Sequence, residues 1–203
     1  MKLSLLCLGV AVAGCARGPV ELGFWIDPIT YQSSRIDGPI TPAELKVIDQ
    51  TARREIETAF ADYAVMLTAN RDARFKVAVL PALRDERLLR GGTHAGESRA
   101  IAGLGGSGAV SFEYVANSAM AIAPESMARA DLIAAIGRGI GRVAIHEFVH
   151  QLLPKSPLHD ATNVRSYEGN SPTIAEGFFG ELQWDIAAPW LESRLAPRAV
   201  VRP

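Results

Sequence analysis

Two histidines and a glutamate carry the strongest chemical signal in the sequence, in the stretch His146-Glu147-Phe148-Val149-His150. On a helix, four residues advance about 6 Å and turn about 400°, so His146 and His150 project from one face. Two imidazoles placed in this way can bind one zinc ion. Glu147, beside the first histidine, can take a proton from a water that the metal has made acidic. The pattern predicts a zinc-dependent peptidase in which Glu147 is the general base.

A catalytic zinc needs a third protein ligand and an open fourth position, and two downstream residues compete to be that ligand. His159 follows His150 by nine residues, and a loop over residues 154–158 could deliver it to the metal. Glu176 lies on a later predicted helix and would give a site of two histidines and one glutamate instead. Residue types alone leave both possibilities open. The residue that is not a ligand is expected to have a structural role, such as a loop hydrogen bond or the orientation of a ligand histidine.

The helix that carries the histidine pair is predicted from the spacing of its apolar residues. They recur every three or four positions from about Pro124 to Leu153, and the prolines that follow end the helix. Three glycines near its middle are expected to let it pack closely against a sheet: Gly137, Gly139 and Gly141.

Further helices and several strands are expected around this one. Thr41-Pro42-Ala43-Glu44 predicts a capped helix of roughly 25 residues, and Ser171-Pro172 predicts a last helix that runs to about Ala187. Alternating or continuous apolar runs predict strands at Glu21–Ile29, Phe75–Leu80 and Ala109–Val115. The glycine-rich run at 103–108 lacks the ending of a phosphate-binding loop, which favours a turn or loop beside a strand. The predicted fold is α/β (α+β), with a small, twisted, mixed sheet and a long N-terminal helix.

From His146 through Leu152-Leu153 to His159, the chain resembles the metzincin zinc peptidases. It looks most like short bacterial metzincin-like proteins, in which a Leu-Leu pair follows the second histidine and the third arrives through a long loop. The resemblance implies a zincin-like fold, zinc held by His146, His150 and His159, and a peptide or protein substrate. It also implies an edge strand that binds substrate as an added strand, a role that falls on residues near Ala109–Tyr114.

The sequence departs from the metzincin pattern in two places. Arg165 stands where the family's turn has a methionine, and the Pro154–Pro157 loop replaces the glycine that usually follows the second histidine. Tyr167, two residues after Arg165, could donate a hydrogen bond to the oxyanion of the transition state, or anchor the loop as a buried tyrosine. Asp160 could orient His159 or turn the loop, and the isolated His94 is expected to be a solvated loop residue.

The first fifteen residues predict export and lipid anchoring. A lysine precedes a short apolar run that ends in Val12-Ala13-Gly14-Cys15, which resembles the bacterial lipobox. That resemblance implies removal of residues 1–14 and acylation of Cys15, with residues 15–20 as the lipidated cysteine and its tether. Ala16 after the cysteine favours the outer membrane over retention at the inner one. The expected location is the bacterial cell envelope, on a membrane surface.

Composition sets the limits of these predictions. The chain has 203 residues, and 21 Lys and Arg against 22 Asp and Glu give a net charge of −1, which speaks against a nucleic-acid partner. The two cysteines, Cys7 and Cys15, precede the folded body, so a metal there must be held by nitrogen and oxygen. No composition break divides residues 21–203, which are expected to form a single peptidase domain.

Three alternatives to a metzincin-like peptidase remain at this level. Pro172–Phe178 is similar to gluzincin peptidases, in which a Glu-Gly on the next helix supplies the metal ligand, here Glu176. The chain could instead be an envelope lipoprotein that keeps the zincin fold, has lost catalysis and has a binding or structural role. It could also be a helical envelope lipoprotein without metal.

Overall fold

The computed structural model describes residues 18–83, 94–101, 104–153, 163–169 and 174–198. Within these ranges the protein has a mixed α/β structure with a five-stranded sheet and five α-helices, which confirms the predicted fold class at that level. The predicted leader, Cys15 and His159 lie outside the described residues. No helix in the described residues has the length and hydropathy needed to cross a bilayer.

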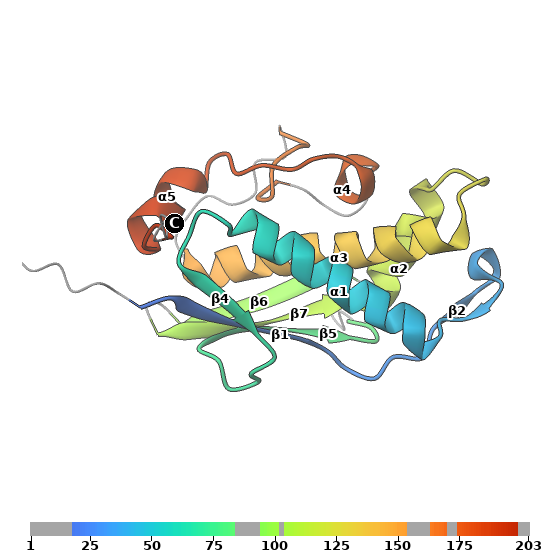
Figure 1. The fold of residues 1–203 in the computed structure, drawn as a ribbon, viewed down its shortest axis with the longest axis horizontal. Coiled ribbons are helices and arrows are strands. Elements are labelled where there is room, and N and C mark those ends of the chain that lie inside the picture. The colour runs from blue at the N-terminus through green and yellow to red at the C-terminus, as the bar shows by residue number, and fades with distance from the viewer. Residues whose placement is uncertain (1–17, 84–93, 102–103, 154–162, 170–173, 199–203) are drawn as a thin grey trace, which may run out of the picture.

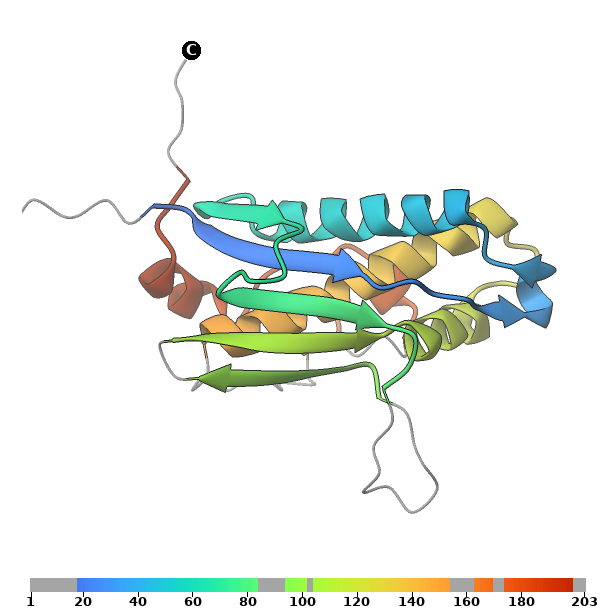
Figure 2. The ribbon, with the colours of Figure 1, turned by 90° about the horizontal axis from the view of Figure 1, so that it is seen from below.

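The sheet is mostly parallel and has one antiparallel edge strand (Figures 1 and 2). β1, β4, β5 and β7 run in the same direction, whereas β6 runs against its neighbour β7. In spatial order the strands are β4 (Val65–Thr68), β1 (Val20–Ile26), β5 (Phe75–Leu80), β7 (Gly105–Ser111) and β6 (Gly96–Ile101). A separate antiparallel pair, β2 (Gln32–Ser33) and β3 (Gly38–Pro39), flanks a short 3-10 helix, η1 (Ser34–Ile36).

Helices cover one face of the sheet, and the C-terminal segment lies over them. Figure 1 shows α1 (Pro42–Ala59) and α3 (Arg129–Leu152) side by side on the sheet, with α2 (Phe112–Ile122) beside one end of α3. The short helices α4 (Glu176–Phe179) and α5 (Ala188–Arg194) lie on the outer side of this layer. Buried apolar side chains from the sheet and from the helices form one hydrophobic cluster. α3 therefore lies between the sheet and the C-terminal segment.

The first helix begins as predicted and ends early. Thr41 caps α1, its side chain accepts from the Glu44 N–H at 3.2 Å, and the Glu44 carboxylate accepts from the Thr41 N–H at 2.9 Å. The helix has 18 residues and ends at Ala59, although the apolar spacing predicts one that continues to Leu67. Leu67 instead belongs to β4, where it pairs with Leu22 of β1. Leu67 therefore continues the three- or four-residue spacing of α1 only by coincidence, because it belongs to a strand.

The glycines of α3 let two helices approach each other, so the prediction that they pack against a sheet is wrong. A Cβ at Gly137 would lie 2.8 Å from the Ile48 carbonyl oxygen, and one at Gly141 would lie 2.7 Å from the Ala52 oxygen. Both contacts are with the backbone of α1, which cannot move aside as a flexible side chain can. A Cβ at Gly139 would meet the Phe178 ring at 2.4 Å.

The edge strand nearest to the motif on α3 is β6, so the expectation that residues near Ala109–Tyr114 form this edge is wrong. β7 is an inner strand, between β5 and β6. It ends at Ser111, whose side chain accepts from the Tyr114 N–H and caps α2. The predicted strand at Ala109–Val115 therefore becomes the end of one strand and the start of a helix.

The predicted C-terminal helix from Ser171 to about Ala187 is wrong for its described part, because residues 174–187 do not form a single helix. α4 has four residues and ends at Phe179, and the next residue, Gly180, has an extended backbone. The chain then runs beside an earlier segment, where the Gln183 N–H donates to the Arg165 carbonyl at 3.0 Å and the Tyr167 N–H donates to the Gln183 carbonyl at 3.1 Å. This long-range pairing, which local propensity does not report, replaces the helix.

Candidate functional site

The two histidines of the motif lie side by side on α3, as the spacing predicts. Their Nε2 atoms are 3.0 Å apart, and their rings stand at 88° with centroids 4.6 Å apart. A zinc ion with tetrahedral angles and bonds of 2.0–2.1 Å would hold two ligand nitrogens about 3.3 Å apart. The pair is therefore close to the spacing that a shared metal ion requires, and imidazole is a ligand that zinc favours.

Glu147 is buried next to this pair. Glu147 is 4% exposed. Its carboxylate lies against β6, where a Cβ added at Gly96 would be 2.5 Å from Oε1. Burial, followed by the negative charge of Glu97, raises the pKa of Glu147 to about 8. A general base is most effective when its pKa is near the working pH, so this environment suits proton transfer.

Two side chains fasten α3 to the sheet around Glu147. The Ser98 hydroxyl of β6 donates to the Glu147 carbonyl oxygen at 3.2 Å. One turn further on, the buried Gln151 accepts from the Lys76 N–H and donates to the Lys76 carbonyl of β5, both at 3.0 Å. The motif does not reveal either contact.

Glycines in β7 make room for these contacts. A Cβ at Gly106 would lie 2.4 Å from the Gln151 side chain, and one at Gly108 would lie 3.0 Å from its amide nitrogen and 3.2 Å from Glu147 Cβ. Glycine inside a strand often marks a place where another backbone or a ligand comes close. Residues 105–108 of the glycine-rich run belong to β7, so the expectation of a turn or loop there is wrong, and the glycines mark the place where α3 packs on the strand.

A cavity of about 380 Å³ lies beside the motif and the edge strand. Its lining comes from β6 and from α3: Gly96, Glu97, Ser98, Ala100, His146, Glu147 and His150. β6 pairs with β7 on one side, and the sheet order ends with it. The residues of β6 that line the cavity beside the histidines are mostly small, which leaves space for an extended chain next to the motif.

His94 lies closer to this cavity than expected. Its Nε2 is 3.6 Å from a carboxylate oxygen of Glu97, one of the cavity residues. The interpretation of His94 as a solvated loop residue therefore needs correction, since its side chain is 32% exposed and faces a charged neighbour.

The described residues do not show which residue would be the third ligand of a metal ion at the histidine pair. Within them, no group of three or more His, Cys, Asp or Glu side chains could hold a metal ion. Among these residues Glu176 forms no such group with the histidine pair. It begins α4, where its carbonyl oxygen accepts from Arg142 Nη1 at 2.7 Å. His159 and Asp160 lie outside the described residues, and ligation by His159 stays a prediction.

Tyr167 lies away from the lining of this cavity, within the segment that packs on α3. The residue is 5% exposed, and its ring centroid is 4.8 Å from that of Trp184. Burial, helped by the charge of Glu55 and opposed by that of Arg142, raises its pKa to about 12. This environment matches a loop-anchoring tyrosine, whereas the oxyanion role has no contact in support of it.

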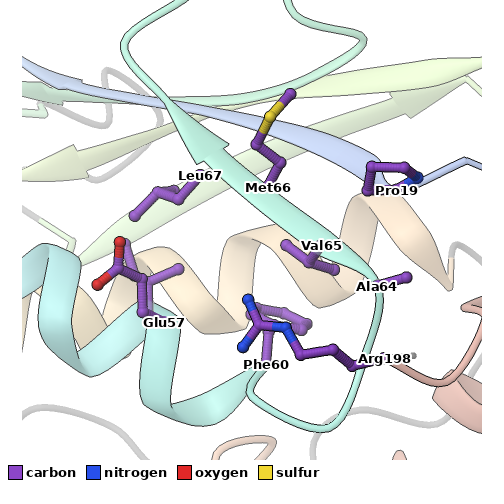
Figure 3. Close-up of a pocket in the computed structure, with 9 residues that line it drawn as sticks. Pro19, Glu57, Phe60, Ala64, Val65, Met66, Leu67 and Arg198 are labelled. Carbon is purple, nitrogen blue, oxygen red and sulfur yellow. The ribbon is translucent and has the colours of Figure 1, made fainter. Parts of the chain in front are cut away.

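A larger cavity, of about 640 Å³, lies at the other edge of the sheet (Figure 3). It is bordered by β4 and the end of α1, with Pro19 and Arg198 from the two ends of the described chain. Its lining contains one carboxylate, Glu57, and no histidine or cysteine. The larger of these two cavities therefore lacks the histidine pair that could bind a metal ion.

No family model, no curated protein and no solved structure matches this chain.

Proposed function

We propose that the protein is a zinc-dependent peptidase of the metzincin-like type, exported and anchored to a membrane through Cys15. One observation carries the proposal: the Nε2 atoms of His146 and His150 lie 3.0 Å apart in a cavity that also holds the buried Glu147. The antiparallel edge strand beside the helix with the motif adds support. The metzincin resemblance implies such an edge strand, although the edge is β6 and not the segment first expected.

In this proposal His146 and His150 hold zinc, and His159 is the third ligand. Zinc, when bound, lowers the pKa of water and polarises a carbonyl oxygen. Glu147 takes a proton from the attacking water, whose oxygen adds to the carbonyl carbon of the scissile bond. The carbon–nitrogen bond then breaks, and Glu147 gives its proton to the leaving amine. The products are a carboxylic acid and an amine, so that one water is consumed for each bond cut.

The substrate lies along β6 as an added antiparallel strand. Backbone N–H and C=O groups on the outer side of an edge strand can pair with an extended peptide, and such pairing favours no particular side chain. Three lining residues of β6 fill little of the cavity, because Gly96 has no side chain and those of Ser98 and Ala100 are small. The peptide backbone can therefore lie close to Glu147 and to the histidine pair.

The test measures zinc content and peptide hydrolysis together. Wild type should contain one zinc per chain and cut members of a peptide library, and a chelator should abolish the cutting. Glu147→Gln should keep the zinc and lose hydrolysis, whereas the control Glu113→Gln, at an exposed position on α2, should change neither. His159→Ala should lower zinc content, and Glu176→Ala should leave it unchanged.

Each part of the proposal has an outcome that contradicts it. Zinc without hydrolysis in wild type would favour the inactive envelope lipoprotein, and no zinc at all would favour the metal-free alternative. Zinc loss in Glu176→Ala, with zinc retained in His159→Ala, would favour the gluzincin alternative, provided that both variants fold.

A further inference from the structure

The turn between β6 and β7 exposes two large apolar side chains. Ile101 is 65% exposed and Leu104 is 71% exposed, the highest values among the large hydrophobic residues that the structure describes. The Leu104 N–H donates to the Ile101 carbonyl at 2.8 Å, which closes the turn and holds the two residues near each other. Exposed apolar groups at the tip of a hairpin cost solvation free energy and favour a site of interaction.

The first strand, β1, begins at the same end of the sheet as the β6–β7 turn. β7 is parallel to β5 and β5 to β1, so the start of β7 and the start of β1 lie at one end, and antiparallel β6 finishes there at Ile101. Figures 1 and 2 agree on this, and both place α5 at this end too. α5 carries Trp190, which is 50% exposed, and tryptophan favours the membrane–water interface.

The predicted anchor cannot lie far from this end. Cys15 precedes Val20, the first residue of β1, by five residues. Five residues reach at most about 17 Å when fully extended. Lipid on Cys15 would therefore hold this end of the domain within reach of the bilayer surface, whatever path residues 15–19 follow.

Arginines border the apolar turn. Arg74 is exposed, and its Nε donates to the Leu104 carbonyl at 2.8 Å. Arg99 is exposed two residues before Ile101. Apolar side chains flanked by arginines suit an interface in which the aliphatic groups enter the bilayer and the cations meet lipid phosphates.

We propose that this end of the domain, termed the membrane end and formed by the β6–β7 turn and α5, rests on the bilayer with Ile101 and Leu104 in the headgroup region. The proposal depends on the proposed anchoring at Cys15 and not on peptidase activity. It also orients the candidate site. Ala100 lines the cavity and directly precedes Ile101, so a peptide bound along β6 has one end close to the lipid surface.

The test uses the exported form that begins at Cys15, which then holds its sole thiol. That thiol is coupled to maleimide lipid in vesicles of phosphatidylethanolamine and phosphatidylglycerol, so the result does not depend on natural acylation. A tryptophan is introduced at the turn by Leu104→Trp. The control is Val47→Trp, at a position 42% exposed near the start of α1, at the opposite end of the domain.

Brominated lipids should quench the added emission at position 104 about twofold more strongly than that at position 47, with a blue shift at position 104 only. Adding Ile101→Ser to Leu104→Trp should weaken the quenching. Equal quenching at positions 104 and 47 would overturn the proposal, as would a blue shift at 104 that depends on protein concentration in the absence of vesicles, since that would indicate a second copy. Mass analysis of exported Cys15 tests the acylation separately.

Discussion

The two edges of the sheet differ in what they offer a ligand. The β4 edge borders the larger cavity, about 640 Å³, but only one carboxylate and no histidine line it. The β6 edge borders about 380 Å³, and two histidines and a glutamate from α3 line it. The difference is one of chemistry rather than of volume. It predicts that substitutions at the β6 edge change catalysis, whereas those at the β4 side change stability or nothing.

The largest expected effect comes from removing a histidine at the β6 edge. His150→Ala deletes half of the pair and should abolish stoichiometric zinc binding, with a loss of activity of about a thousandfold or more. The matched change at the β4 edge, Arg198→Ala, should leave both zinc content and rate near wild type. Metal analysis and kcat/KM on both variants check this comparison. A loss of activity in Arg198→Ala would show that the larger cavity matters.

The second prediction concerns the pH dependence of the metal-free protein. Burial raises the pKa of Glu147 to about 8, above the ordinary value of 4.5, so the folded state binds more protons than the unfolded state between these pH values. The free energy of unfolding should therefore fall as pH rises from 4.5 to 8. The loss is at most about 4–5 kcal/mol, at 1.36 kcal/mol for each pKa unit.

Glu147→Gln removes this titration and should flatten that pH dependence. Denaturant titrations in the presence of chelator, at several pH values, measure the slopes. Glu113→Gln serves as the control and should keep the wild-type slope. Equal slopes in wild type and Glu147→Gln would show that the carboxylate is less desolvated than its position indicates.

The third prediction tests how α3 is held against the inner strand β5, next to the β6 edge. Gln151→Leu leaves the Lys76 N–H and carbonyl without their side-chain partner, which should cost about 2–3 kcal/mol of stability. Because Gln151 lies one turn after Glu147, kcat should fall about tenfold while zinc stays bound and KM changes little. The control is Gln50→Leu, at an exposed position on α1. If stability falls but kcat does not, Gln151 is a structural residue only.

The sequence predicted the placement of the histidine pair better than the elements around it. Helical spacing brought His146 and His150 onto one face, because a helix places residues four apart by local geometry alone. The predicted edge strand was wrong, since whether Ala109–Tyr114 lies at an edge depends on where β6 pairs, which is a long-range property. The predicted last helix failed for the same reason, because Gln183 pairs with a segment that is distant in sequence.

The smallest expected effect lies at the start of α1, which flanks the β4 side. Glu44 caps the helix and pairs with Arg129 at the start of α3, with 2.6 Å between Arg129 Nε and Glu44 Oε1. The hydrogen bond from Arg129, then that from the Thr41 backbone, lowers the pKa of Glu44 to about 2. The folded state therefore binds fewer protons than the unfolded state between about pH 2 and pH 4.5, and the stabilisation is lost as pH falls through this range.

Glu44→Gln should thus cost about 1 kcal/mol at pH 7, the scale of one cap and one partly exposed ion pair, and almost nothing below pH 2. Glu57→Gln, on the same helix and lining the larger cavity, is the control and should change stability by less. Neither variant should alter kcat/KM. The two glutamates therefore affect the free energy of unfolding with opposite pH dependence. Raising the pH strengthens the stabilising contribution of Glu44 and weakens that of Glu147. If the two carboxylates showed pH dependences of the same sign, the contrast between the ion-paired Glu44 at the start of α1 and the buried Glu147 beside β6 would fail.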